Sequence, residues 1–64
     1  MTPRELDVVQ LVARGRTNAE VASALFISLG TVKAHLGSIT VKLGARNRVE
    51  IAAWAWGSGQ VRDD

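Results

Sequence analysis

Residues whose chemistry suits nucleic-acid binding gather in the central part of this 64-residue chain. Lys33 is a long cationic donor that can reach guanine O6 and N7 or a phosphate. Ala34 is short and apolar, which suits contact with a thymine methyl group. Ser28 and Thr31 carry hydroxyls at the start of a predicted helix, where free amides and the helix dipole favour a phosphate. These residue types predict contacts to double-stranded DNA.

Positive charge is concentrated in the same region. The formal net charge is +2, but residues 14–48 hold six basic side chains against the single acid Glu20, which gives +5. The segments before and after sum to −1 and −2. The basic residues are Arg14, Arg16, Lys33, Lys42, Arg46 and Arg48. This distribution is typical of phosphate binding, although lysine and arginine also serve simply to solvate a surface.

Catalysis and metal binding have few residues to support them. The chain has no cysteine and His35 is its single histidine, so a thiolate or multi-histidine metal site is excluded. Glu5, Glu20 and Glu50 lie near predicted helix starts, which explains them without an acid/base role. Residues 57–59 are a Gly-Ser-Gly turn and not a phosphate-binding loop. We therefore expect no enzyme activity, no metal, no cofactor and no small-molecule ligand.

Two predicted helices, 18–25 and 29–43, position the candidate residues. Thr17 and Glu20 form a capping box before the first helix, and Ser28 caps the second after a short break. Two helices joined by three residues are typical of a helix-turn-helix, whose second helix enters the major groove. The buried stripe of helix 29–43 is Leu29, Val32, Leu36, Ile39 and Leu43. The face left for DNA is Thr31, Lys33, Ala34, His35, Gly37, Ser38 and Lys42.

Two further helices complete an all-α fold, a four-helix bundle that contains the helix-turn-helix. Helix 3–14 begins with a second capping box, Thr2 with Glu5, and with Pro3 at the first helical position. Its predicted buried stripe is Leu6, Val9, Val12 and Ala13. The fourth helix, 48–57, follows the cap residue Asn47. After it, Val61 is expected to return to the core and residues 62–64 to fray.

The fourth predicted helix is apolar on two faces. Ile51, Ala52 and Ala55 form a stripe toward the core, and a second stripe lies beside it. A helix with two apolar faces usually has two partners, and exposed aromatic residues are enriched at interfaces. We therefore predict a homodimer through the second stripe, with a small core that wraps both Trp54 and Trp56 as the alternative. The second stripe is Val49, Ala53 and Trp56.

Several motifs in order resemble the LuxR-type helix-turn-helix, the output domain of NarL/FixJ response regulators and quorum-sensing activators. They are Thr2-Pro3-Arg4-Glu5, Thr17-Asn18-Ala19-Glu20-Val21-Ala22, Gly30-Thr31-Val32-Lys33 with His35, Lys42-Leu43-Gly44 and Asn47-Arg48. The resemblance covers residues 2 to about 61. It implies a transcriptional regulator domain that binds imperfect palindromes as a dimer through its fourth helix. Such domains usually follow a receiver or ligand-sensing domain, so residues 1–64 are expected to be one domain from the C-terminal part of a longer regulator.

The resemblance also implies site residues. Base contacts are expected at Lys33, Ala34 and Gly37. Phosphate contacts are expected at Thr17, Thr31 and Lys42, and from the residues themselves we add Ser28 and Arg46. RNA polymerase is a further candidate partner. No apolar run reaches the length of a membrane span, so the expected location is the cytoplasm.

The sequence departs from the family pattern on the predicted recognition helix. Leu29 replaces a polar residue, and Gly37 stands where relatives carry a polar or cationic side chain. Thr40 and Val41 replace better helix formers. A small helical interaction module that no longer binds DNA is therefore the alternative function. A sigma-factor-like domain is disfavoured by the Gly-Thr-Val-Lys sequence at residues 30–33.

Overall fold

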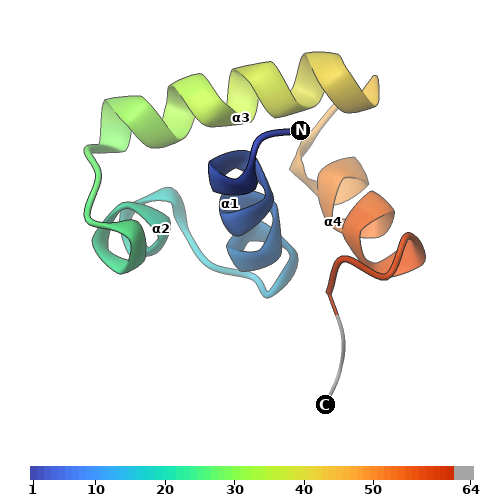
Figure 1. Cartoon of the computed structure of the whole chain (residues 1–64), viewed down its shortest axis with the longest axis horizontal. Coiled ribbons are helices and arrows are strands. Elements are labelled where there is room, and N and C mark those ends of the chain that lie inside the picture. The colour runs from blue at the N-terminus through green and yellow to red at the C-terminus, as the bar shows by residue number, and fades with distance from the viewer. Residues whose placement is uncertain (62–64) are drawn as a thin grey trace.

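The computed structural model describes residues 1–61 and contains four helices (Figure 1). They are α1 (Pro3–Ala13), α2 (Asn18–Leu25), α3 (Leu29–Leu43) and α4 (Arg48–Gly57). No strand occurs in the described part of the chain, so the all-α prediction is confirmed. Helix α1 ends one residue before the predicted boundary, because Arg14 is its C-cap. The predicted frayed end, 62–64, lies outside the described residues.

Side-chain caps fix where the helices begin. The Thr2 hydroxyl accepts a hydrogen bond from the Glu5 amide at 3.2 Å, and the Glu5 carboxylate accepts one from the Thr2 amide at 2.9 Å. Thr17 and Glu20 repeat this capping box at α2, at 3.1 and 2.9 Å. At α3 the Ser28 hydroxyl accepts from the Thr31 amide at 3.1 Å. Each cap satisfies an amide that has no partner within its own helix.

Left-handed residues fix where two of the helices end. Gly44 terminates α3 with φ +65°, a conformation that costs glycine little. Phe26 terminates α2 with φ +57°, which is unfavourable for a bulky residue, and the residue is 94% exposed. This turn sets α3 at 107° to α2, within the range found for helix-turn-helix pairs.

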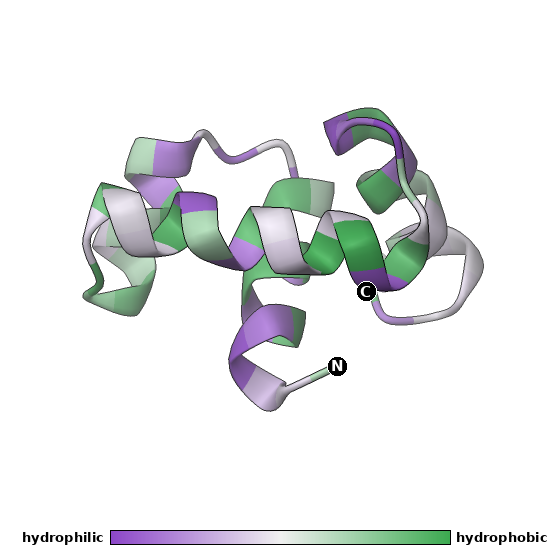
Figure 2. Ribbon diagram, turned by 90° about the horizontal axis from the view of Figure 1, so that it is seen from above, coloured by the Kyte–Doolittle hydropathy of each residue, from purple (hydrophilic) through white to green (hydrophobic). Residues whose placement is uncertain are grey.

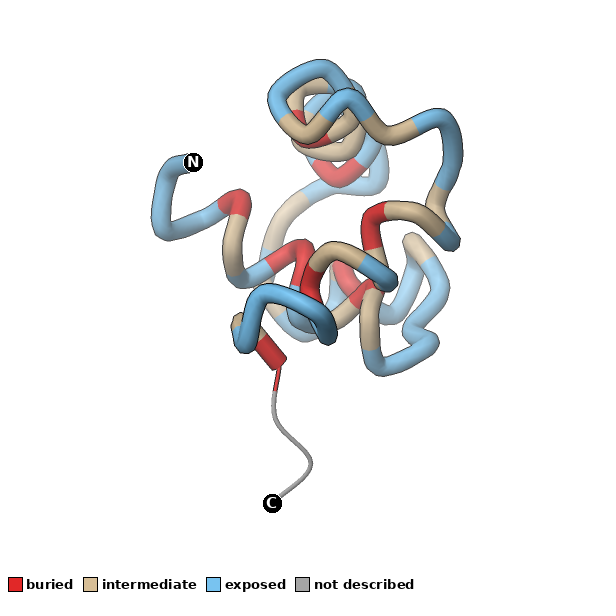
Figure 3. The backbone as a smooth tube through the Cα atoms, turned by 90° about the vertical axis from the view of Figure 1, so that its right-hand side faces the viewer, coloured by how far each residue is buried: buried red, intermediate tan, exposed pale blue. Residues whose placement is uncertain are grey.

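The core forms where α1 meets the other three helices. In Figure 1, α1 lies between α2 and α4, and α3 crosses above all of them. Figure 3 shows the buried segments gathered inside, where these elements face one another. The buried apolar residues are Val8, Val9, Val12, Val21, Val32, Ile39, Ile51, Ala55 and Val61. Burial of Val61 confirms that the chain returns to the core after α4.

Two predictions about the core are wrong in detail. The stripe predicted for α1 omitted Val8, which is fully buried, and included Leu6 and Ala13, which are half-buried. Because three helices pack around α1, it buries more than one stripe, and the adjacent Val8 and Val9 both lie inside. Leu29, predicted to be buried, is 44% exposed. It lies in the first turn of α3, where it lines a hollow beside the α1–α2 loop instead of the core.

Candidate nucleic-acid interface

The outer face of α3 is uncovered. Figure 1 shows α3 across one side of the molecule, with the other helices on its inner side only. Seen from above in Figure 2, the helix crosses the molecule and alternates between hydrophilic and hydrophobic residues. Lys33, Ala34 and Gly37, the predicted base contacts, are all exposed on it. They lie within about one turn of one another, so one face presents all three.

The hydroxyls predicted to bind phosphate lie at two helix starts. Thr17 caps α2, and Ser28 caps α3. The Ser28 and Thr31 hydroxyl oxygens are 2.8 Å apart and share a hydrogen bond. All three residues are exposed. The structure therefore holds these hydroxyls beside the positive ends of the α2 and α3 dipoles.

The cations predicted to bind phosphate each have a carboxylate partner. The Lys42 ammonium lies 2.7 Å from Glu5 Oε1. The Arg46 guanidinium donates to Glu50 Oε2 at 3.0 and 3.1 Å, and its backbone amide donates to the other oxygen at 2.5 Å. These bonds from Arg46 lower the pKa of the Glu50 carboxyl. A phosphate contacted by either cation would share it with a carboxylate.

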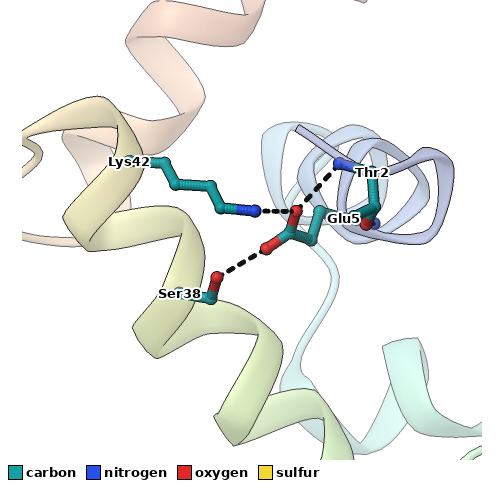
Figure 4. Close-up of polar contacts among 4 residues, drawn as sticks. All are labelled: Thr2, Glu5, Ser38 and Lys42. Carbon is teal, nitrogen blue, oxygen red and sulfur yellow. Dashed lines mark hydrogen bonds and ion pairs between the residues drawn. The ribbon is translucent and has the colours of Figure 1, made fainter.

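A buried carboxylate ties α1 to α3 (Figure 4). Glu5 is only 4% exposed, and its carboxylate accepts hydrogen bonds from Lys42 and the Thr2 amide on one oxygen and from the Ser38 hydroxyl on the other. The Ser38 bond is 2.7 Å long. The Lys42 ammonium, followed by Ser38 and the Thr2 amide, holds the pKa of the Glu5 carboxyl far below its usual value, although burial alone would raise it. The carboxylate therefore stays charged inside the protein.

This network corrects the face assigned to two residues. Ser38 and Lys42 were predicted to face DNA, but both turn toward α1 and bond to Glu5. Only the capping role of Glu5 was predicted, because its partners on α3 are 33 and 37 positions away. The signal that could have found it is the charge of Lys42, one turn after Ser38 on a helix that packs against α1.

Arg48 joins α4 to the start of α2. Its guanidinium donates to the Asn18 side-chain oxygen at 2.5 Å and to the Arg16 carbonyl oxygen. From the sequence, Arg48 was predicted only as part of the Asn47-Arg48 motif, without a hydrogen-bond partner. In Figure 1, α1 lies between α2 and α4. The Arg48 side chain therefore links α4 to the α1–α2 loop, which it holds through the Arg16 carbonyl oxygen.

The residues predicted for a dimer interface lie on the surface of α4. Val49 is 75% exposed, Ala53 is exposed and Trp56 is 43% exposed. The Trp56 indole also donates from Nε1 to the Ala13 carbonyl oxygen at 3.1 Å, so part of this ring packs against the end of α1. Trp54 is half-buried against the core. The two indoles therefore have different surroundings, as their spacing on the helix requires.

Residues 1–61 offer neither a metal site nor a single membrane-crossing helix. No three His, Cys, Asp or Glu side chains there gather to hold a metal ion. No single helix is long and apolar enough to cross a membrane, and only the sharply bent pair of α2 and α3 passes that test by length and composition.

Comparison with known proteins identifies the arrangement. The family of bacterial regulatory proteins described as the luxR family matches residues 1–55. The chain belongs to the luxR family. Over 55 residues it is 42% identical to the transcriptional regulatory protein LiaR of Bacillus subtilis, covering 86% of this chain and 26% of LiaR. It is 40% identical over the same length to the oxygen regulatory protein NreC of Staphylococcus aureus, covering 86% of this chain and 25% of NreC.

LuxR-family membership establishes the class of function. The chain carries a helix-turn-helix domain that binds DNA in transcription regulation, and its relatives LiaR and NreC are both described as regulatory proteins. The family is not catalytic, so the prediction that the chain is no enzyme is confirmed. The chain spans about a quarter of the length of these relatives.

The Glu5 network predicts a specific dependence of stability on pH. Below the usual Glu pKa of 4.5 the unfolded chain takes up a proton that the folded chain, with its much lower pKa, does not bind. The stabilisation from Glu5 is therefore present above pH 4.5 and is lost progressively as the pH falls from this value toward the much lower pKa of the folded state. Glu5→Gln should lower the melting temperature at neutral pH and flatten its fall in acid.

Glu20→Gln is the matched control for this measurement. Glutamine preserves a capping box, so both variants retain that bond, and only Glu5→Gln strips the ionic partner from Lys42. Thermal unfolding followed by circular dichroism at neutral and acidic pH should show the larger loss in Glu5→Gln. Equal losses in the two variants would mean that the contacts of Glu5 to α3 contribute nothing to stability.

Proposed function

We propose that the chain is a sequence-specific output domain of a transcriptional regulator that inserts the outer face of α3 into the DNA major groove. The observation that carries this proposal is the exposure of Lys33, Ala34 and Gly37 together on an uncovered helix. Membership in a DNA-binding family supplies the partner. A helix with side chains fits the width of the major groove of B-form DNA.

The exposed face of α3 that carries Lys33, Ala34 and Gly37 is the proposed reading face, and each of these residues has a proposed role. Lys33 donates to guanine O6 and N7, and Ala34 contacts a thymine methyl group. Gly37 provides no side chain, and a Cβ atom there would meet nothing within 4 Å in the protein itself. Packing within the chain therefore does not require glycine at this position, which favours a close approach of the DNA. Thr17, Ser28 and Thr31 contact phosphates at the helix starts. Lys42 and Arg46 add cationic contacts near and beyond the C-terminal end of α3, where each shares its charge with a carboxylate, Glu5 or Glu50.

We further propose that two copies assemble on DNA through α4. Val49, Ala53 and Trp56 give this helix an exposed apolar stripe. Such a contact is small, so the dimer would be weak in solution and complete on a palindromic site. RNA polymerase contacts, a cytoplasmic location and attachment to a receiver or sensory domain stay predictions from the sequence.

Replacement of Lys33 tests the reading face. Lys33→Ala should weaken binding to the preferred site by about 1–3 kcal/mol and flatten the preference at one base pair, because the bidentate contact to guanine is lost. Arg46→Ala should instead weaken all sequences alike and lower the slope of log affinity against log salt by about one. Selection from random duplexes followed by fluorescence anisotropy measures both effects.

Unchanged affinity and sequence preference in a folded Lys33→Ala variant would contradict the assignment of α3 as the reading helix. The alternative function has its own signature in the same titration. An interaction module without DNA affinity would show no salt-sensitive binding of the unmodified chain to any duplex.

Ala53→Glu tests the assembly. It places a charge at the centre of the proposed contact, where an unpaired carboxylate is costly, yet Ala53 is exposed in the monomer and its loss leaves the core intact. Cooperative binding to a palindromic duplex should disappear while the helical circular-dichroism signal is retained. Gln10→Glu adds the same charge at an exposed position of α1 and should leave cooperativity unchanged. Cooperative binding by Ala53→Glu would place the dimer contact elsewhere.

A further inference from the structure

Val41 is the most exposed large apolar residue of α3. It is 81% exposed, and it does not belong to the core cluster of the described residues. A β-branched residue also lowers helix propensity at an exposed position, so nothing in the fold favours valine there. Around the helix axis, Val41 lies about 180° from the buried Val32 and about 200° from the buried Ile39, so it points away from the core.

The polar side chains around Val41, in the last two turns of α3, are all bonded within the protein. They are Ser38, Thr40 and Lys42. The serine hydroxyl and the lysine ammonium bond to the Glu5 carboxylate, each at 2.7 Å. The threonine hydroxyl donates to the Leu36 carbonyl oxygen of its own helix, also at 2.7 Å. Gly37 and Val41 are then the outward positions of this half of the helix.

Val41 continues the proposed reading face toward the C-terminal end of α3. Ala34, Gly37 and Val41 are spaced by three and four residues, so they share one face of the helix, and all three are exposed. Lys33 lies beside this line, one turn before Gly37. In Figure 2, which looks onto this side of α3, a strongly hydrophobic band crosses the helix near its C-terminal end. The face is therefore cationic near its start and apolar toward its end.

An apolar side chain in the major groove is matched by the methyl group of thymine. The other groups that distinguish base pairs there are hydrogen-bond donors and acceptors, which valine cannot serve. Valine is short, so the helix must lie close to the base edges for this contact, and Gly37 puts no side chain in the way. Val41 is seven residues beyond Ala34, about 10 Å along the axis, which corresponds to about three base pairs.

We propose that Val41 is a specificity-determining residue that contacts the methyl group of a thymine in the major groove. This thymine lies about three base pairs beyond the one that Ala34 contacts. The proposal rests on the proposed function and extends it, because each half-site would present a guanine to Lys33 and A·T pairs to the C-terminal half of α3. Glu5 contributes indirectly, since it draws two polar side chains inward and leaves this half of the face apolar.

Deoxyuridine scanning tests the contact, because uracil is thymine without its methyl group. Each thymine of the selected duplex is replaced in turn, and fluorescence anisotropy measures the affinities of the unmodified chain and of Val41→Ala. The unmodified chain should lose about four-fold in affinity at the thymine that faces Val41, the effect of one methyl group returned to water. Val41→Ala should bind the thymine duplex more weakly and be insensitive to uracil at that position alone. The thymine of Ala34 should stay sensitive in both proteins.

Thr40→Ala is the matched control. It also replaces a β-branched residue by alanine, at the adjacent position of α3, but the Thr40 side chain turns back to its own helix. Its uracil scan should therefore reproduce that of the unmodified chain. Because alanine raises helix propensity and Val41 is exposed, Val41→Ala should melt no lower than the unmodified chain, so lost affinity would not reflect lost folding.

Identical uracil scans of Val41→Ala and the unmodified chain would overturn the proposal, as would the same change of scan in Thr40→Ala. If Lys33→Ala still loses its preference for guanine in either case, the proposed function of α3 stands and only the role of Val41 fails. If the unmodified chain shows no salt-sensitive binding to any duplex, the proposed function fails and this inference fails with it.

Discussion

The position of the reading helix depends on one buried carboxylate. Glu5 begins α1 as part of a capping box and also accepts hydrogen bonds from Ser38 and Lys42 on α3. A buried charge is costly unless it is paired and hydrogen-bonded, and here both oxygens are satisfied. The same side chain therefore fixes the start of one helix and the placement of another. Without it, α3 would be held against α1 mainly by apolar contacts such as those of Val32 and Ile39, which have no directional preference.

A second polar link, made by Arg48, holds the start of α2. Arg48 reaches from α4 to Arg16 and Asn18, so the helix proposed for dimerisation also holds the segment around Thr17, which is proposed to bind phosphate. Glu5 and Arg48 together connect α1 to α3 and α4 to α2, while α1 fills the centre. The exposed face of α3 is left with side chains that make no contact needed for folding, which explains why Lys33, Ala34 and Gly37 are available for DNA.

Local signals in the sequence predicted the four helices, but the long-range contacts between them could not be predicted from it. The pairs Thr2–Glu5 and Thr17–Glu20 are three residues apart, and a cap acts within one turn, so the helix starts follow from spacing alone. Gly44 similarly predicted the end of α3. The bonds from Glu5 to α3, from Arg48 to Asn18 and from Trp56 to Ala13 join residues at least 30 positions apart. No periodicity encodes such pairs, and the exposure of Leu29 depends on a hollow formed by three segments. Residue types on α3 predicted the reading face, but its detailed contacts with DNA stay a prediction.

Chemical-shift mapping of the chain with its selected duplex tests the central claim most directly. If α3 reads the major groove, the largest changes should fall on the amides of Lys33, Ala34 and Gly37, while buried positions of α1 such as Val8 and Val9 stay nearly constant. High salt should reverse the changes, because phosphate neutralisation drives much of the binding. Changes confined to the outer face of α4, or none on α3 at low salt, would contradict the account.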